Sequence, residues 1–202
     1  MSMSLSAEEQ TRIGVDRFVF FSDAVFAIAI TLLALEIHLP ENVDLSSESS
    51  VLSGLIAIIP SFFSYVLSFL VIGAIWSVHV RKYRALVQYD RVFMMSNLVL
   101  LLFVAFIPFP TALLSESDTK VATILYASTF VVIELISFVS WQYAVKKKFL
   151  SANIAEQTIR NGLFSSLAMG AIFLISIVIA LFNADIAKFS WLLIIPALRF
   201  IR

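Results

Sequence analysis

The sequence predicts an all-α integral membrane protein with six transmembrane helices, and its composition and apolar runs carry this prediction. Of the 202 residues, 60% are hydrophobic, and the mean hydropathy is +0.97. A soluble domain of this size has too few polar groups to cover so much apolar surface. The apolar residues fall in six long runs, and roughly 20 such residues cross a bilayer core about 30 Å thick. With only five glycines and no alternating pattern, an outer-membrane β-barrel is disfavoured.

Short loops separate the expected helices, which use up the chain. The helices are expected over residues 18–39, 51–80, 92–114, 121–145, 159–182 and 186–201. Proline marks several of them, because it lacks the backbone N–H that a helix interior needs. Pro40 is expected to stop the first helix, Pro60 to kink the second, and Pro108 and Pro110 to distort the third, while Pro196 lies in the short sixth. We therefore expect one six-helix transmembrane domain over residues 1–202 and no separate soluble module.

The basic residues are divided unequally between the two sides of this six-helix arrangement. Of the 14 lysines and arginines, all but Lys120 and Lys188 fall on one side. The positive-inside rule places that side, and both termini, in the cytoplasm. The opposite loops carry several acidic residues, which are either ordinary solvated loop charges or an outer face that concentrates cations. These acidic residues are Glu41, Asp44, Glu48, Glu116, Asp118 and Asp185.

Other features of the composition limit the classes of function. The net charge of zero gives no argument for a nucleic-acid partner, and the absence of cysteine rules out disulfides and thiolate metal sites. Two histidines and no cysteine supply little for an enzyme, so we expect neither catalysis nor a cofactor or metal. Residues 1–16 lack the features of a signal peptide, so the first apolar run is expected to remain as a helix.

The first helix carries the polar residue of greatest interest and two apolar stripes. Asp23 is expected one to two turns inside the membrane, where an unpaired carboxylate costs several kcal/mol. Ile28, Leu32 and Leu35 form a bulky stripe, and Asp23 points about 140° away from Ile28. A second stripe is small and allows close helix approach. It consists of Ala24, Ala27, Thr31 and Ala34.

The bulky stripe has two interpretations. If several copies of the helix surrounded an axis, the stripe would form an apolar constriction, and such constrictions gate by excluding water. The simpler interpretation is contact with lipid or with the interior of the bundle.

Polar residues of later helices offer partners for Asp23. The topology places Asp23, His79 and Asn97 toward the cytoplasmic half, where a hydrogen-bonded cluster would satisfy the carboxylate. A proton relay or pH sensor through His79 is the functional alternative. Glu134 lies near the middle of the fourth helix and is expected to face protein or a wet crevice.

A motif at the start of the first helix resembles a known family. The segment Arg17-x-x-x-Phe21-Ser22-Asp23 matches the signature of the transmembrane protein 175 family, the lysosomal potassium channel and its bacterial relatives. Residues 24–35 also look like that family's first helix, and Trp76, His79 and then Asn97 to Pro110 resemble later family positions less specifically. With one six-helix repeat, the chain resembles the bacterial type, which implies a homotetramer whose first helix lines a central pore.

The resemblance implies a function and assigns roles to residues. It implies a potassium-permeable channel for monovalent cations, with passive conduction and no Thr-Val-Gly-Tyr-Gly filter, in a bacterial inner membrane. Ile28, Leu32 and Leu35 would form the hydrophobic constriction or gate. Thr31 would contribute to selectivity.

The motif residues would have a structural role. The resemblance implies that Arg17, Ser22 and Asp23 hold the first helix against the second and third through Trp76, His79 and Asn97. Arg17 falls on the same stripe as Ile28. It is expected to precede the regular helix, to snorkel to the interface, or to pair with Asp16 or Asp90.

A proton-coupled secondary transporter is the alternative function. It would use Asp23, His79 and Glu134 as titrating groups. Carriers of this class often contain paired half-repeats with broken helices, and the sequence contains no convincing repeat of three helices plus three.

Overall fold

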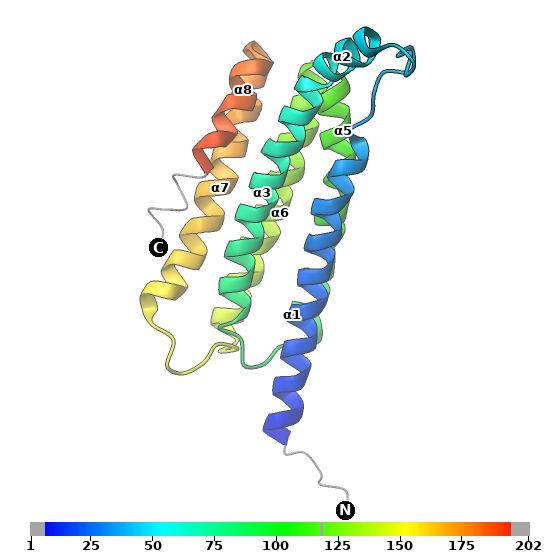
Figure 1. Ribbon diagram of the computed structural model, residues 1–202. Helices are drawn as coiled ribbons and strands as arrows, with labels where there is room; N and C mark the ends of the chain where they lie inside the picture. Colours follow the sequence, from blue (N-terminus) through cyan, green and yellow to red (C-terminus); the bar gives the residue numbers. More distant parts are fainter. Residues whose placement is uncertain (1–6, 118, 195–202) are drawn as a thin grey trace, which may run out of the picture.

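Long apolar helices dominate the computed structural model, which describes residues 7–117 and 119–194. Within these residues, five helical segments are long and apolar enough to cross a membrane. They are Arg12–Glu36, Ile59–Tyr83, Arg91–Glu116, Lys120–Lys146 and Glu156–Phe182. They form a bundle of roughly aligned helices (Figure 1), which confirms the all-α prediction. The predicted sixth helix, 186–201, lies partly outside the described residues.

The first helix is longer and ends differently than predicted. Helix α1 spans Ala7–Leu32 and is followed by the 3₁₀ turn η1, Leu33–Glu36. The prediction began the helix at the first apolar run, but the polar residues before it also favour helix, and Val15 and Phe18 are buried beside Tyr83. The chain becomes extended at Ile37, so it leaves the helix before Pro40.

Proline divides two of the predicted helices instead of only bending them. Residues 51–80 belong to α2, Glu48–Ala57, and to α3, Ile59–Tyr83, which begins next to Pro60. Residues 92–114 belong to α4, Arg91–Phe106, and to α5, Pro108–Glu116. The first turn of a helix tolerates proline because its N–H groups have no partner within the helix, so a new helix starts there. Figure 1 shows α2 lying across one end of the bundle.

The remaining helices follow the prediction more closely. Helix α6 spans Lys120–Lys146 and α7 spans Glu156–Phe182, close to the predicted limits. The chain then turns at Asn183, whose side chain accepts hydrogen bonds from the first backbone N–H groups of α8, Ala184–Ser190. The 3₁₀ turn η2, Trp191–Leu193, follows, and the Trp191 indole N–H donates to the Ser176 hydroxyl at 2.8 Å. This bond holds the returning chain against α7 (Figure 1).

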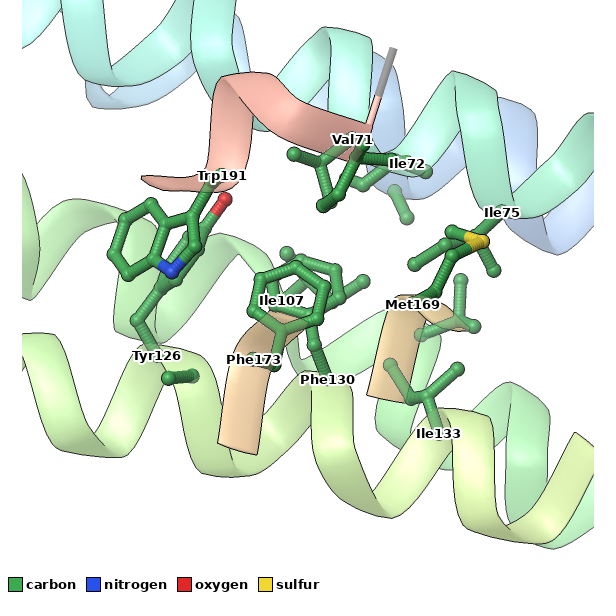
Figure 2. Close-up of a cluster of buried hydrophobic side chains, with 14 of the residues drawn as sticks. Val71, Ile72, Ile75, Ile107, Tyr126, Phe130, Ile133, Met169, Phe173 and Trp191 are labelled. Atoms are coloured by element: carbon green, nitrogen blue, oxygen red, sulfur yellow. The ribbon is translucent and has the colours of Figure 1, made fainter. Parts of the chain in front are cut away.

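The core lies where α3, α6 and α7 meet (Figure 2). Phe130 of α6 stacks on Phe173 of α7 with ring centroids 4.6 Å apart, and Tyr126 stacks on Trp191 at 4.4 Å. Apolar side chains of α3, such as Ile72, close the cluster from the third side. Such close packing by large rings fixes the relative positions of these three helices.

At the end of the bundle opposite α2, hydrogen bonds join the loop that follows α3 to the loop that follows α6. Val87 N–H donates to the Phe149 carbonyl at 2.9 Å, and Ser151 N–H donates to the Ala85 carbonyl at 3.0 Å. Asp90 caps α4 by accepting the Phe93 N–H at 2.8 Å, and it also accepts the Tyr143 hydroxyl of α6 at 2.7 Å.

Acid should remove the contribution of Asp90 to stability. The Phe93 N–H, and then the Tyr143 hydroxyl, hold the pKa of Asp90 below its usual 3.8. The ionised carboxylate therefore stabilises the fold above that usual pKa, and its contribution disappears as the pH falls through the lower folded-state pKa. We expect Asp90→Asn to lower the unfolding temperature at about pH 7 and to differ progressively less from wild type below about pH 4. A difference that stays constant over this range would contradict the assignment.

Gly162 should tolerate no side chain. A Cβ at this position would lie 2.6 Å from Trp141 Nε1, whose N–H donates to the Ile159 carbonyl at 3.0 Å. Gly162→Ala must displace a buried ring, and we expect it to lower the free energy of unfolding by about 1–3 kcal/mol.

Gly73 provides a matched control, because a Cβ there meets nothing within 4 Å. Gly73→Ala should stabilise α3 by about 0.5–1 kcal/mol through helix propensity. Unfolding of both variants in the same detergent measures the contrast, and equal effects would show that Trp141 does not restrict position 162.

Candidate functional site

One face of α1 is left uncovered by the rest of the chain. Ile28 is 58% exposed and Leu35 is 74% exposed, and Leu32 is also exposed. The opposite face, with Phe26, Ala29 and Leu33, is buried in the core. Leu35 lies in η1 rather than in the regular α-helix, so the turn of the chain at its position is tighter than the predicted i, i+7 spacing assumes.

The small stripe lies on the same uncovered side. Ala24, Ala27, Thr31 and Ala34 are all exposed. Through the regular helix, the exposed residues from Ala27 to Leu32 occupy a sector of about 140° at 100° per residue. Both stripes singled out in the sequence are therefore largely uncovered by the rest of the chain.

Thr31 has a defined orientation within this face. Its hydroxyl donates to the Ile28 carbonyl at 2.9 Å. Because the hydroxyl proton is used in that bond, the oxygen lone pairs remain available to a hydrogen-bond donor or a cation outside the helix.

Ser22 of the motif joins α1 to two other helices. Ser22 is buried, and its hydroxyl donates to the Phe18 carbonyl at 3.1 Å and accepts the Asn97 amide at 3.0 Å. The Asn97 carbonyl oxygen in turn accepts the Tyr83 hydroxyl at 2.8 Å. The chain of bonds links α1, α4 and α3. Tyr83 was not among the predicted residues, although its place one turn after His79 could have indicated it.

Asp23 has a different partner from the one considered first in the sequence. The Trp76 indole N–H of α3 donates to Asp23 Oδ1 at 2.8 Å. A charge-assisted bond of this kind accounts for a carboxylate near the membrane interior. Asp23 and Asn97 thus belong to two separate hydrogen-bonded groups.

His79 lies between aromatic rings. It is buried, stacks on Tyr83 at 3.8 Å between centroids, and approaches Phe26 at 5.2 Å. Its Nε2 has no hydrogen-bond partner in the described part of the chain. Among residues 7–117 and 119–194, no direct hydrogen bond connects the His79 side chain with Asp23 or Glu134.

The other two motif residues point outward. Phe21 is exposed, and so is Arg17. Arg17 lies well inside α1, which begins at Ala7, so it does not precede the regular helix. Within the described residues it forms no salt bridge with Asp16 or Asp90.

Comparisons with known proteins place this geometry in a family. The sequence profile described as "Endosomal/lysosomal potassium channel TMEM175" matches residues 17–108. The chain is also 36% identical over 157 residues to a potassium channel of Chamaesiphon minutus, covering 76% of each chain. The chain belongs to the TMEM175 family.

Further relatives of this TMEM175-family chain support the same family assignment. A potassium channel of Streptomyces collinus is 37% identical over 131 residues, covering 62% of each chain. The crystal structure of a lysosomal potassium-selective channel TMEM175 homologue from Chamaesiphon minutus superposes with a TM-score of 0.80 at 27% identity. That match covers 93% of this chain and 97% of the other. With its apolar helices, the TMEM175-family chain is therefore a multi-pass membrane protein.

The residues matched by the TMEM175 profile contain the contacts of α1. The match begins at Arg17 and ends at Pro108, after α4. It thus includes both the pair Asp23 and Trp76 and the chain of Ser22, Asn97 and Tyr83.

A second polar group of this TMEM175-family chain lies outside α1, and the pairing of Lys82 with Glu134 within it was not predicted, although Glu134 was expected to face protein or a wet crevice. Lys82 is only 3% exposed, and its ammonium donates to the hydroxyls of Ser137 at 2.9 Å and Ser166 at 2.7 Å. Glu134, 2% exposed, interacts electrostatically with Lys82. From the sequence, Lys82 was only one of the basic residues on the expected cytoplasmic side. Its spacing from Ile75 and Val78 places it on the core face of α3, and this was the available signal.

Charged residues gather at the two ends of this TMEM175-family bundle. The basic end is where α3 and α6 finish and α4 and α7 begin, and it carries Arg81, Arg84, Arg91, Lys146, Lys147, Lys148 and Arg160. The acidic end, with α2 and the start of α6, carries Glu41, Asp44, Glu48, Glu116 and Asp185. The same division of charges in the sequence predicts the two sides of a membrane.

Proposed function

We propose that this chain is a subunit of a homotetrameric, potassium-permeable cation channel in which four copies of α1 surround the conduction pathway. The observation that carries the proposal is the uncovered sector of α1, which contains both a bulky and a small apolar stripe. In the most hydrophobic 18-residue stretch of each span, 28% is buried in the span that contains α1 and 44% in α6. The first span therefore has more surface left for contact with other copies of the chain. Family membership and relatives named as potassium channels support conduction of potassium.

The bulky stripe forms the constriction in this proposal. Ile28, Leu32 and Leu35 from four subunits project toward one axis and produce a narrow apolar passage. Water leaves such a passage readily, and ions then face a barrier that depends on its width and polarity. Passive conduction needs no titrating group or cofactor along this path.

Thr31 supplies the polar element next to the constriction. Its hydroxyl proton is donated to the Ile28 carbonyl, so four oxygen atoms with free lone pairs would face permeating monovalent cations. Hydroxyl oxygens replace part of the hydration shell of a cation. This makes Thr31 the residue that we assign to selectivity.

The motif residues keep α1 in position. Asp23 is bonded to Trp76 of α3, and Ser22 is bonded to Asn97 of α4. These bonds lie on the side of α1 that faces its own subunit, so they fix the helix without occupying the pathway. His79 contributes by packing against Phe26 and Tyr83. Arg17 and Phe21 are exposed and lie on the same face of α1 as Ile28.

The topology of the proposed channel follows the charges. The basic end lies in the cytoplasm by the positive-inside rule, and the acidic end faces outward and raises the local concentration of cations. The chain crosses a bacterial inner membrane six times as a single domain, with both termini inside. Support for the sixth crossing is the turn at Asn183 and the return of α8 along α7.

Ion flux through the purified full-length protein in liposomes tests the proposal. We expect rapid, gradient-driven potassium flux, slower sodium flux, and a tetrameric mass by native mass spectrometry. Slow, saturable flux that requires a proton gradient would support instead the proton-coupled transporter with Asp23, His79 and Glu134. Absence of flux under either cation gradient would refute the channel.

A further inference from the structure

We propose that a pocket at the acidic end of each subunit binds an amphiphile with a primary ammonium head and an apolar chain. The pocket has a volume of about 490 Å³, which is in the range of small-molecule sites. The first turns of α3, the end of α5 and helix α8 form its walls, at the end of the bundle that carries α2 (Figure 1). Helix α1 contributes none of the lining residues, so the site is separate from the proposed conduction pathway.

Much of the lining is apolar. It includes Phe63 and Leu67 of α3, Leu114 of α5, Phe189 of α8 and Leu192 of η2. Leu67 and Leu114 are buried, whereas Phe63 and Phe189 are among the exposed apolar residues of the subunit. A ligand in the pocket covers apolar surface that the subunit itself leaves open, and removal of such surface from water is the main favourable term in most binding. The lining therefore suits a ligand with an alkyl chain.

Two hydroxyl groups of the lining are available to a ligand. Ser61 and Ser64 lie three residues apart in α3, and both line the pocket. Neither side chain forms a hydrogen bond within residues 7–117 and 119–194. By contrast, the hydroxyl of Ser115, also in the lining, donates to the Ala112 carbonyl at 2.7 Å. The oxygen atoms of Ser61 and Ser64 can therefore accept hydrogen bonds from a bound molecule.

The charged groups of the lining favour a cation. They are Glu116 of α5 and Lys188 of α8. The Lys188 ammonium already forms a salt bridge with Asp185, with 3.5 Å between Nζ and Oδ1, so its charge is offset. Glu116 is exposed and forms no hydrogen bond or salt bridge with another described residue. The charge that remains for a ligand is therefore the negative charge of the Glu116 carboxylate.

The end of α5 adds further acceptors for an ammonium group. The chain becomes extended at Ser117, and the last four carbonyl groups of a helix have no partner within that helix. Cations are stabilised at such helix ends. The protein uses this chemistry elsewhere, because the Lys120 ammonium donates to the Leu181 carbonyl in the last turn of α7 at 2.7 Å. A primary ammonium has three N–H donors, which suit a carboxylate, helix-end carbonyls and serine oxygens together.

Protection of an introduced thiol tests the proposal, because the chain contains no cysteine. Ala57 lines the pocket without a polar side chain, so Ala57→Cys in the full-length protein reports on occupancy. The measurement is the rate at which uncharged N-ethylmaleimide modifies this thiol in neutral detergent. We expect hexylammonium to slow the reaction in a saturable way. Hexanol, which has the same chain without the charge, should bind about ten-fold more weakly, the effect of losing one charged hydrogen bond.

Glu116→Gln in the Ala57→Cys chain should weaken the binding of hexylammonium about ten-fold. Glu48→Gln is the matched control, because Glu48 is an exposed carboxylate of the same end outside the pocket lining, and it should leave the binding unchanged. Ser53→Cys, at an exposed position of α2 outside the lining, should show no protection.

Dihexanoyl phosphatidylethanolamine carries the same ammonium on a lipid headgroup. Stronger protection by this lipid than by hexylammonium would identify a lipid as the source of the ammonium, and weaker protection would identify a free amine. Equal protection by hexanol, equal effects of the two glutamine variants, equal protection of the Ser53→Cys thiol, or no saturable protection of the Ala57→Cys thiol would overturn the proposal.

Discussion

Replacing Ile28 by asparagine is expected to raise potassium flux through the reconstituted protein by about ten-fold. In the proposed tetramer, the four Ile28 side chains form part of an apolar passage that excludes water, and an amide at the same position keeps the passage hydrated. A ten-fold rise corresponds to a barrier lower by about 1.4 kcal/mol. The measurement is the initial rate of potassium efflux from liposomes with equal amounts of protein.

Ile175→Asn is the control for this prediction. Ile175 of α7 is 58% exposed in the isolated subunit, the same fraction as Ile28, so both substitutions add an amide to an apolar surface of equal exposure. Only Ile28 lies on the uncovered face of α1. Similar flux through the two variants and wild type would remove Ile28 from the constriction, and a rise in both would indicate nonspecific leakage.

Replacing Lys82 by methionine is expected to lower the free energy of unfolding by about 3–5 kcal/mol, because it leaves Glu134 buried without its counter-charge. Removing both charges should cost much less than removing one, since a neutral pair requires no counter-charge in a dry interior. The double variant Lys82→Met with Glu134→Gln should therefore recover most of the stability. Unfolding of the single and double variants in one detergent measures the coupling energy.

Arg84→Met is the control for Lys82→Met, because it removes a positive charge from an exposed position instead of a buried one. Arg84 lies two residues further along the chain and is exposed, so its loss should change stability by no more than about 0.5 kcal/mol. If Lys82→Met were as mild as Arg84→Met, or if the two changes in the double variant were additive, the buried pair would have no energetic coupling.

Local patterns explain which parts of the fold could be predicted. The spans of α6 and α7 were predicted closely because long apolar runs bounded by charges specify a membrane helix from composition alone. The breaks at Ile58 and Ile107 were predicted only as kinks or distortions, since proline either bends a helix or starts a new one. The start of α1 was missed because residues 7–17 are largely polar, so the apolar run that marks a membrane helix begins only at Phe18.

Local patterns also indicated some residues of the candidate site, but not their partners on other helices. The motif named Ser22 and Asp23, and helical spacing separated the direction of Asp23 from that of Ile28. Helical spacing could not identify Trp76 as the partner of Asp23, or Tyr83 as the partner of Asn97. Each of these hydrogen bonds joins two different helices, and spacing within one helix does not show how another helix packs against it.

By itself, the sequence determined that this protein is helical and membrane-embedded, with basic residues at one end and a first helix of two apolar stripes. These properties follow from the order of residues within single segments, where hydropathy, periodicity and charge act locally. Only the tertiary structure decided that both stripes of α1 remain uncovered, that Lys82 turns inward to Glu134, and that Glu116 borders a pocket. Those outcomes depend on how helices distant in sequence pack, because a side chain becomes buried, paired or free only when its neighbours are in place.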